Sequence, residues 1–278
     1  MEHWTEFEAP IRLGVFAGLL ALFSALEFII PAKERVKPRL RRWETNLGLL
    51  VSSSVLVRIL LPLAATAFAF DMQARGLGLF NWLNLPVWLE VVLAIFLLDF
   101  AVWFQHVIMH FTPPLWAFHK VHHVEEDLDA STGIRFHPGE MLFSFGFKLV
   151  AIGLIGAPAL AVFLFEVILN AASLFEHASI RIPKPIDSAL RKVIVTPDMH
   201  RVHHSVYEDE TNSNFGFCLS AWDRLFKTYR AQPRDGHADM KLGLNERPSG
   251  GTTGFIWALF VPFRKNQAAR TQSGSSDA

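Results

Sequence analysis

The sequence predicts an all-α integral membrane protein in which four to five membrane helices carry a cytoplasmic helical cap with a histidine-rich site for two metal ions. Hydrophobic residues make up 51% of the 278-residue chain and the mean hydropathy is +0.28, which is high for a soluble protein. Four long apolar stretches account for this composition. Eight of the twelve histidines fall into three tight clusters. The stretches predict the membrane helices, and the clusters predict the metal site.

The apolar stretches predict where the chain crosses the bilayer. A span needs about 20 mostly apolar residues, and three stretches are near this length: Leu13–Ile30, Leu47–Phe70 and Pro86–Phe104. The fourth, Met141–Phe175, is long for one span and short for two, and Gly153, Gly156 and Pro158 interrupt it. We expect two helices joined by a tight bend, either as a hairpin of two spans or as a re-entrant pair. A very apolar soluble protein is the alternative, but it would have to bury all four stretches.

Charged residues around these stretches orient the chain. The segment between the first two stretches, from Lys33 to Arg42, is strongly basic, whereas the N-terminal tail is acidic. Basic loops tend to stay on the cytoplasmic side, so this loop is predicted to be cytoplasmic and the N-terminus to lie outside. Counting crossings from there places residues 176–278 and all three histidine clusters on the cytoplasmic side.

Several simpler features limit the interpretation. The net charge of zero gives no indication of a nucleic-acid partner, and the single cysteine, Cys218, excludes an internal disulfide or a cysteine-based metal site within the chain. The acidic tail before Leu13 lacks the basic start of a cleavable signal peptide. We expect one membrane domain over residues 1–265 and a disordered tail over residues 266–278. Gly254–Phe263 fits either an interfacial helix or a packing segment.

The three histidine clusters have helical spacing. They read H-V-I-M-H, H-K-V-H-H and H-R-V-H-H, and their histidines are His106, His110, His119, His122, His123, His200, His203 and His204. Residues three and four apart share one face of a helix, so each cluster forms an imidazole patch. Imidazole suits iron, zinc, copper and nickel. Eight imidazoles exceed the need of one ion and therefore predict a site for two.

The residues around the clusters occur in a fixed order of motifs. The first motif contains Asp99, Trp103, Phe104, His106 and His110. The second contains Trp116, His119, His122 and His123, followed by Arg135, His137 and Pro138. The third contains Thr196, Pro197, His200, Arg201, His203 and His204, followed by Asn214, Phe215, Gly216, Trp222, Asp223, Leu225, Phe226, Thr228 and Tyr229. This series resembles the membrane fatty acid hydroxylase and sterol desaturase superfamily over about residues 97–229, although Val107 stands where the family often has arginine.

The resemblance implies a membrane-bound oxidoreductase that uses two iron ions and molecular oxygen to hydroxylate or desaturate a C–H bond of a lipid. It also implies a ninth ligand, His177, because the family has a lone histidine at the corresponding place. The resemblance does not identify which lipid is the substrate. Electrons are expected from an external donor (a ferredoxin, a cytochrome or a reductase), because the chain shows no second redox domain.

Ligand histidines need acceptors that hold their orientation. Candidates near the clusters, each of which also fits a solvated or capping role, are Asp99, Glu125, Glu126, Asp198, Asn214 and Asp223. His137 is a further candidate and fits a structural loop role equally well. In the fourth apolar stretch, Glu166 and Asn170 are one turn apart and fit either the lining of a substrate passage or helix packing. Lys148 of the same stretch is expected near the end of a span.

Two other classes of protein also collect histidines near a bilayer. A non-catalytic metal-binding membrane protein or a transporter is one alternative, although transporters usually bind at mid-membrane between repeated halves, and this chain shows no repeat. A zinc hydrolase is another, but catalytic zinc usually has three protein ligands. Metal identity and oxygen dependence distinguish these classes from the oxygenase.

Overall fold

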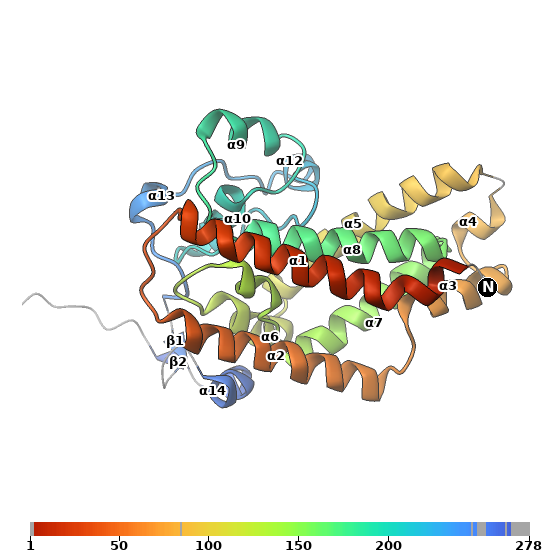
Figure 1. Ribbon diagram of the computed structural model, residues 1–278, viewed down its shortest axis with the longest axis horizontal. Coiled ribbons are helices and arrows are strands. Elements are labelled where there is room, and N and C mark those ends of the chain that lie inside the picture. The colour runs from red at the N-terminus through yellow and green to blue at the C-terminus, as the bar shows by residue number, and fades with distance from the viewer. Residues whose placement is uncertain (1–2, 84, 246, 249–253, 265, 268–278) are drawn as a thin grey trace, which may run out of the picture.

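Five long helices lie side by side and carry a cap of short helices at one end (Figure 1). This arrangement comes from a computed structural model that describes residues 3–83, 85–245, 247–248, 254–264 and 266–267. The long helices are α1 (Glu8–Ile29), α2 (Arg39–Leu60), α5 (Val87–Phe111), α7 (Pro138–Ile155) and α8 (Ala159–His177). The described residues contain five helical segments long and apolar enough to cross a membrane, so the predicted helical membrane architecture is confirmed.

Short elements complete the fold. Around the long helices and in the cap lie η1 (His3–Phe7), α3 (Ala65–Ala74), α4 (Leu79–Trp82), α6 (Pro113–His123), η2 (Ala130–Ile134), α9 (Lys184–Leu190), α10 (Pro197–His203), α11 (Glu208–Thr211), α12 (Ala221–Leu225), α13 (Gly236–Asp239), α14 (Phe255–Phe260) and η3 (Val261–Phe263). Two short antiparallel strands, β1 (Arg247–Pro248) and β2 (Asn266–Gln267), pair with each other. Apart from β2, the tail predicted to be disordered lies outside the described residues.

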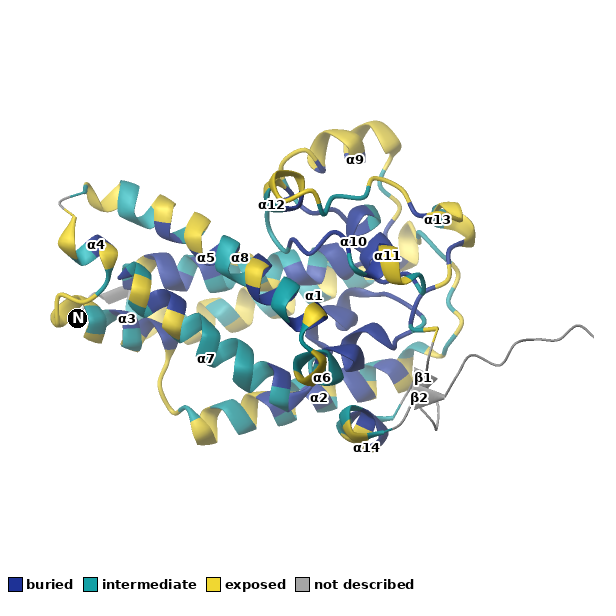
Figure 2. Ribbon diagram, turned by 180° about the vertical axis from the view of Figure 1, so that it is seen from behind, coloured by how far each residue is buried: buried dark blue, intermediate teal, exposed yellow. Residues whose placement is uncertain are grey.

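The outer surface of the long helices is apolar. Leu13 is 68% exposed, Ile59 is 68% exposed and Leu154 is 72% exposed. Figure 2 shows that exposed and half-buried residues alternate along these helices, whereas the interior of the cap is buried. Large apolar side chains left uncovered along whole helices indicate hydrocarbon surroundings.

The second apolar stretch departs from its predicted boundaries. Residues 47–70 do not form one helix, because α2 begins at Arg39 and ends at Leu60, and α3 starts only at Ala65. Pro62 explains the break, since proline has no N–H to donate and disfavours helical geometry in the residue before it. Leu61 accordingly leaves the helical region, with φ −129° and ψ 73°. An apolar run alone cannot reveal such an interruption.

The fourth stretch forms two helices, as predicted, and a glycine makes the bend. Gly156 ends α7 in the left-handed conformation, with φ 67°. It packs on Gly78, where an added Cβ would lie 2.4 Å from the Cα of Gly156. The left-handed conformation of Gly156 makes the bend between α7 and α8, and the absence of a side chain at Gly78 lets the segment before α4 pack against it. Each of the two helices is long enough to cross the membrane.

The cap lies at the opposite end of the bundle from the N-terminus (Figure 1). The basic segment that joins α1 to α2 lies at the cap end, together with α6 and α10, which carry two of the histidine clusters. The basic loop and the clusters therefore share one end of the bundle, as the charge pattern predicts. That this end is cytoplasmic stays a prediction.

A buried ionic network fixes the cap to the bundle. Arg42 of α2 is fully buried and donates to Glu125 (2.5 Å), to Asp129 (2.7 Å) and to the carbonyl of Asp127 (2.9 Å). In α1, Glu27 accepts from the backbone N–H of Ala130 at 2.7 Å. These bonds hold η2, and the chain that leads to it from α6, against the cap ends of α1 and α2.

We predict that Arg42→Met destabilises the folded protein by about 3–5 kcal/mol, because removing one partner leaves buried carboxylates without compensation. Thermal unfolding of the purified protein in detergent measures the change. Arg75→Met is the matched control, since Arg75 pairs with Asp71 on the surface, with side chains 63% and 47% exposed. Equal shifts in the two variants would contradict the assigned role of Arg42.

Candidate metal centre

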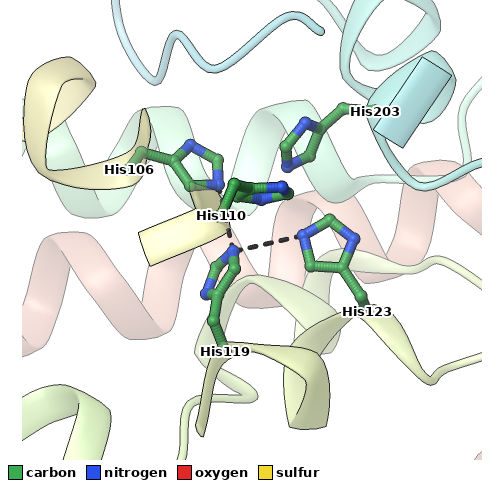
Figure 3. Close-up of side chains that lie close together, drawn as sticks. All are labelled: His106, His110, His119, His123 and His203. Atoms are coloured by element: carbon green, nitrogen blue, oxygen red, sulfur yellow. Dashed lines mark hydrogen bonds between the residues drawn. The ribbon is translucent and has the colours of Figure 1, made fainter. Parts of the chain in front are cut away.

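Nine buried histidines from four helices converge at the junction of bundle and cap. They form two groups, and in each group the candidate ligand atoms lie within 4.8 Å of one another. The first group, shown in Figure 3, contains His106, His110, His119, His123 and His203. The second group contains His122, His177, His200 and His204.

Local geometry explains how the chain delivers these side chains. His106 and His110 lie in the last turns of α5, and Thr112 then adopts an extended conformation because Pro113 follows it. The chain reverses there, and α6 returns its own histidines to those of α5. The third cluster lies on α10, which begins at Pro197 after the cap residue Thr196.

Each H-x-x-H-H motif divides between the two groups. On α6, His119 and His123 are four residues apart and face the first group, whereas His122 faces the second. In the third cluster, whose His204 directly follows α10, the assignment is reversed: His200 and His204 face the second group, and His203 faces the first. The two motifs therefore contribute to both groups, and α6 and α10 link them.

The Nε2 atoms approach one another closely within each group. In the first group, Nε2 of His119 lies 3.1 Å from Nε2 of His106 and of His123. In the second group, the corresponding Nε2 distances are 3.0 Å for His122–His177, 3.0 Å for His177–His200 and 3.2 Å for His200–His204. Neighbouring ligands have about this separation when an ion lies roughly 2.1 Å from each nitrogen.

Hydrogen bonds at the opposite ring atom determine the tautomer. Nδ1 of His106 faces the carbonyl of Phe215 at 2.8 Å, and Nδ1 of His177 faces the carbonyl of Ser173 at 2.7 Å. A carbonyl only accepts, so in both rings Nδ1 carries the proton and the lone pair lies on Nε2. Nδ1 of His203 is held in the same way, 2.7 Å from the carbonyl of Ser213.

The Nε2 lone pairs of His106 and His177 point toward neighbouring imidazoles, so a metal ion between the rings would be coordinated by them. Two further nitrogens, Nε2 of His110 and Nε2 of His203, are buried without a hydrogen-bond partner. The donor set therefore fits metal ions, one in each group.

Burial also keeps the rings neutral, which is the form that binds metal. Outside the long helices, burial lowers the pKa of His119 to about 3. Burial, followed by the neighbouring imidazoles, lowers the pKa of the other cap histidines well below the ordinary value, namely those of His122, His123, His200, His203 and His204.

Two of the predicted orienting residues act on the loop behind the first group. Asp223 accepts from the backbone N–H of Phe215 and of Gly216, both at 2.9 Å, and Phe215 in turn holds His106. Asp99 accepts from Trp222 at 2.8 Å and from two backbone N–H groups of the same loop at 3.3 Å. Both carboxylates therefore reach the histidines only through the backbone.

The other candidates lie farther from the ligand rings. Asn214 has φ 52° and its amide donates to the carbonyls of Met199 and Arg230, both at 2.9 Å. His137 caps α7, where it accepts from the N–H of Gly139 at 2.9 Å. The remaining acidic candidates pair with basic residues: Asp198 with Arg201, Glu125 with Arg42, and Glu126 with Lys37.

Two direct partners of the candidate ligand histidines are not predicted from the sequence. Glu140 of α7 is buried and lies 2.7 Å from Nδ1 of His119, forming a carboxylate–histidine pair of the kind that orients metal ligands. The amide oxygen of Asn212 lies 3.1 Å from Nδ1 of His110. Glu140 has a detectable pattern, an acidic residue in the first turn of an apolar helix, but its partner is set by packing.

A cavity of about 140 Å³ borders the first group. His106, His119 and Glu140 form one end, and the wall continues between α5, α7 and α8 with mostly apolar side chains, among them Met109, Phe145 and Leu169. The α7 wall is half-buried over residues 141–149, so it also contacts the surroundings of the bundle. The centre is therefore next to an apolar space within the membrane region.

Comparisons with known proteins agree on one group of enzymes. Residues 91–228 match the model of the fatty acid hydroxylase family. Ornithine lipid hydroxylase of Rhizobium tropici is 31% identical over 182 residues, which cover 65% of this chain and 52% of that protein. Cholesterol 25-hydroxylase of Rattus norvegicus is 24% identical over 245 residues, covering 81% and 80% of the two chains. Alkylglycerol monooxygenase of Homo sapiens is 27% identical over 156 residues, covering 55% and 33%.

The matched region covers different fractions of these relatives. The chain spans about half the length of the ornithine lipid hydroxylase and about a third of the human alkylglycerol monooxygenase. No solved structure gives a significant match to the chain.

We predict that the purified protein holds two metal ions per chain and that each group binds one of them. His203→Ala removes a ligand of the first group and His200→Ala one of the second, so each variant is expected to retain close to one ion. Elemental analysis by mass spectrometry measures the content. His237→Ala, outside both groups, is the matched control. Retention of two ions in both ligand variants would contradict the assignment of these groups.

Proposed function

Because this chain belongs to the fatty acid hydroxylase family, we propose that it hydroxylates a C–H bond of a membrane lipid. The observation that carries the proposal is the position of the centre: nine buried histidines lie beside an apolar cavity whose wall includes His106 and His119. Two iron ions bound there would supply the activation of molecular oxygen. The matching relatives named as lipid hydroxylases and as monooxygenases support the same reaction class.

The residues of the chain bind the ions, orient the ligands and exclude water. All nine histidines are buried, and backbone carbonyls or Glu140 hold the rings of four of them, so these ligands are fixed before substrate binds: His106, His119, His177 and His203. The cavity wall places apolar side chains such as Met109 and Leu169 next to His106. An acyl or other apolar segment therefore replaces water at the reactive position.

The membrane position supports a lipid as substrate. The cavity lies between α5, α7 and α8, which belong to the candidate spans, and the α7 side is half-buried. A lipid would approach through this side without leaving the bilayer. The basic segment at the cap end favours a cytoplasmic position of the centre.

Electrons would come from a separate protein. The chain has a single cysteine, Cys218, and therefore cannot ligate an iron–sulfur cluster with its own thiolates. A ferredoxin, a cytochrome or a reductase docked at the cap would supply two electrons for each hydroxyl group formed, and the second oxygen atom of O₂ would leave as water.

Metal transport is less well supported by the geometry. Transporters usually bind their ions at mid-membrane between repeated halves, whereas both histidine groups lie at the end of the bundle (Figure 1). A zinc hydrolase typically uses three protein ligands for a catalytic ion, fewer than either group provides. The apolar cavity beside the ligands distinguishes the oxygenase from a protein that only stores metal.

We predict that cells expressing the wild-type protein and its redox partner under ¹⁸O₂ form a lipid that has gained one labelled oxygen atom. In His203→Ala this product should fall by more than about 100-fold, because even partners of metal ligands contribute 10- to 100-fold. Mass spectrometry of extracted lipids at matched protein abundance measures it.

Ser54→Leu is the control for this experiment, because Ser54 is exposed on α2 and its hydroxyl bonds only to the carbonyl of Leu50 in the same helix. The control should form the product at the wild-type level. If the wild type forms no labelled lipid in a host that supplies electrons and substrate, the proposed hydroxylation is wrong. A lipid that loses two hydrogens instead would identify a desaturase.

A further inference from the structure

The cavity beside the first histidine group has a polar far end. Its lining continues from Glu140 along α7 to Lys148 and along α8 to Asn170. Lys148 follows Glu140 by eight residues of one helix, which corresponds to about 12 Å at 1.5 Å per residue. Lys148 is therefore not near the end of a span, as the sequence suggested, but in the middle of α7. Polar groups at this depth are uncommon and usually have a function.

The charges at the far end balance. Lys148 pairs with Glu166 of α8, and Glu166 also pairs with Arg12 of α1. Arg12 bonds to Glu8 at 2.7 Å, and Glu8 accepts from Thr66 at 2.9 Å. Two cations and two carboxylates leave no net charge in this network. The far end therefore has no electrostatic preference for an anionic or a cationic group.

Lys148 and Asn170, at the far end of the cavity, can still donate hydrogen bonds after the ion pairs have formed. An ammonium group has three donors, and Glu166 is the single hydrogen-bond acceptor that Lys148 has within the described chain. Asn170 lines the cavity but is an exposed residue of α8, and its amide has no hydrogen-bond partner among the described residues. By contrast, Gln105 donates to Ser144 at 2.7 Å and Ser173 donates to the carbonyl of Gly133 at 2.9 Å.

An amide without a partner is unfavourable inside a membrane, because hydrocarbon offers no hydrogen bonds. Lys148 lies about two turns beyond Glu140 on α7, and Asn170 lies about two turns before His177 on α8, so both polar groups line the cavity away from the histidines. A ligand that enters the cavity with an oxygen atom in the right place satisfies both donors.

We propose that Asn170 and Lys148 form a subsite that binds a neutral oxygen of the lipid substrate: a hydroxyl, ether or carbonyl group. This deepens and rests on the proposed hydroxylation. The apolar segment of the same lipid fills the cavity between the subsite and the centre. A cavity of about 150 Å³ holds a group the size of benzene, so the 140 Å³ available here hold only part of that segment and not a whole lipid. The substrate class is therefore a lipid with a neutral oxygen about 12 Å from the hydroxylated carbon.

The test compares two probes that differ by one oxygen, radiolabelled 1-dodecanol and dodecane. Their binding to the iron-loaded protein in nanodiscs is measured after subtraction of protein-free nanodiscs. The wild type should prefer the alcohol, and the ratio of the two affinities should fall about fivefold in Asn170→Leu, as for the loss of one hydrogen bond. Because bilayer partitioning is the same for each variant, it cancels from this comparison.

Two further variants complete the design. Lys148→Met/Glu166→Leu removes the second donor together with its counter-charge and should lower the same ratio. This variant keeps the subsite testable if Asn170→Leu fails to fold. Ser54→Leu replaces a polar residue on a span outside the cavity and should keep the wild-type ratio. Iron content should be unchanged in every variant.

An unchanged ratio in both Asn170→Leu and the double variant would overturn the subsite, even if the wild type hydroxylates a lipid. Conversely, discrimination between the probes that is lost in Asn170→Leu would support the subsite even if no lipid gains oxygen. The two results separate the failure of the subsite from the failure of the proposed function.

Discussion

The structure depends on one constraint: neutral imidazoles converge in a buried site. His106 and His177 have their Nδ1 protons committed to backbone carbonyls, so their Nε2 lone pairs point toward the neighbouring rings. Burial lowers the pKa of the rings and keeps them neutral, as it does for His119. The junction of bundle and cap therefore presents several nitrogen donors to each of two points, which is the arrangement that a metal ion needs.

Residues of the cap hold the histidine rings in position. Asp223 holds the loop whose carbonyl at Phe215 orients His106, and Asp99 ties the following residues of the loop to α5. On the opposite side of the site, Arg42 anchors the segment that follows α6. Each of these charged groups is buried. The two carboxylates bind the backbone of the loop, and Arg42 binds side chains of the segment after α6, so the ligand rings are positioned by a rigid frame.

The sequence predicts features set by spacing along one helix better than features set by packing between helices. Helical spacing is enough to identify the three clusters, because residues three and four apart share a face without reference to the rest of the chain. The division of His119 and His122 between two groups depends on how α6 faces α5, α8 and α10, and spacing cannot reveal it. Glu140 was missed for the same reason. The break at Pro62 was missed because hydropathy does not register a lost backbone donor.

The metal positions themselves are the most direct test of this account. Anomalous diffraction at the iron absorption edge, from crystals of the iron-loaded protein, would locate each ion independently of any activity. The account predicts two separate peaks, one surrounded by the Nε2 atoms of the first histidine group and one by those of the second. A single peak, or iron bound away from these nitrogens, would contradict it.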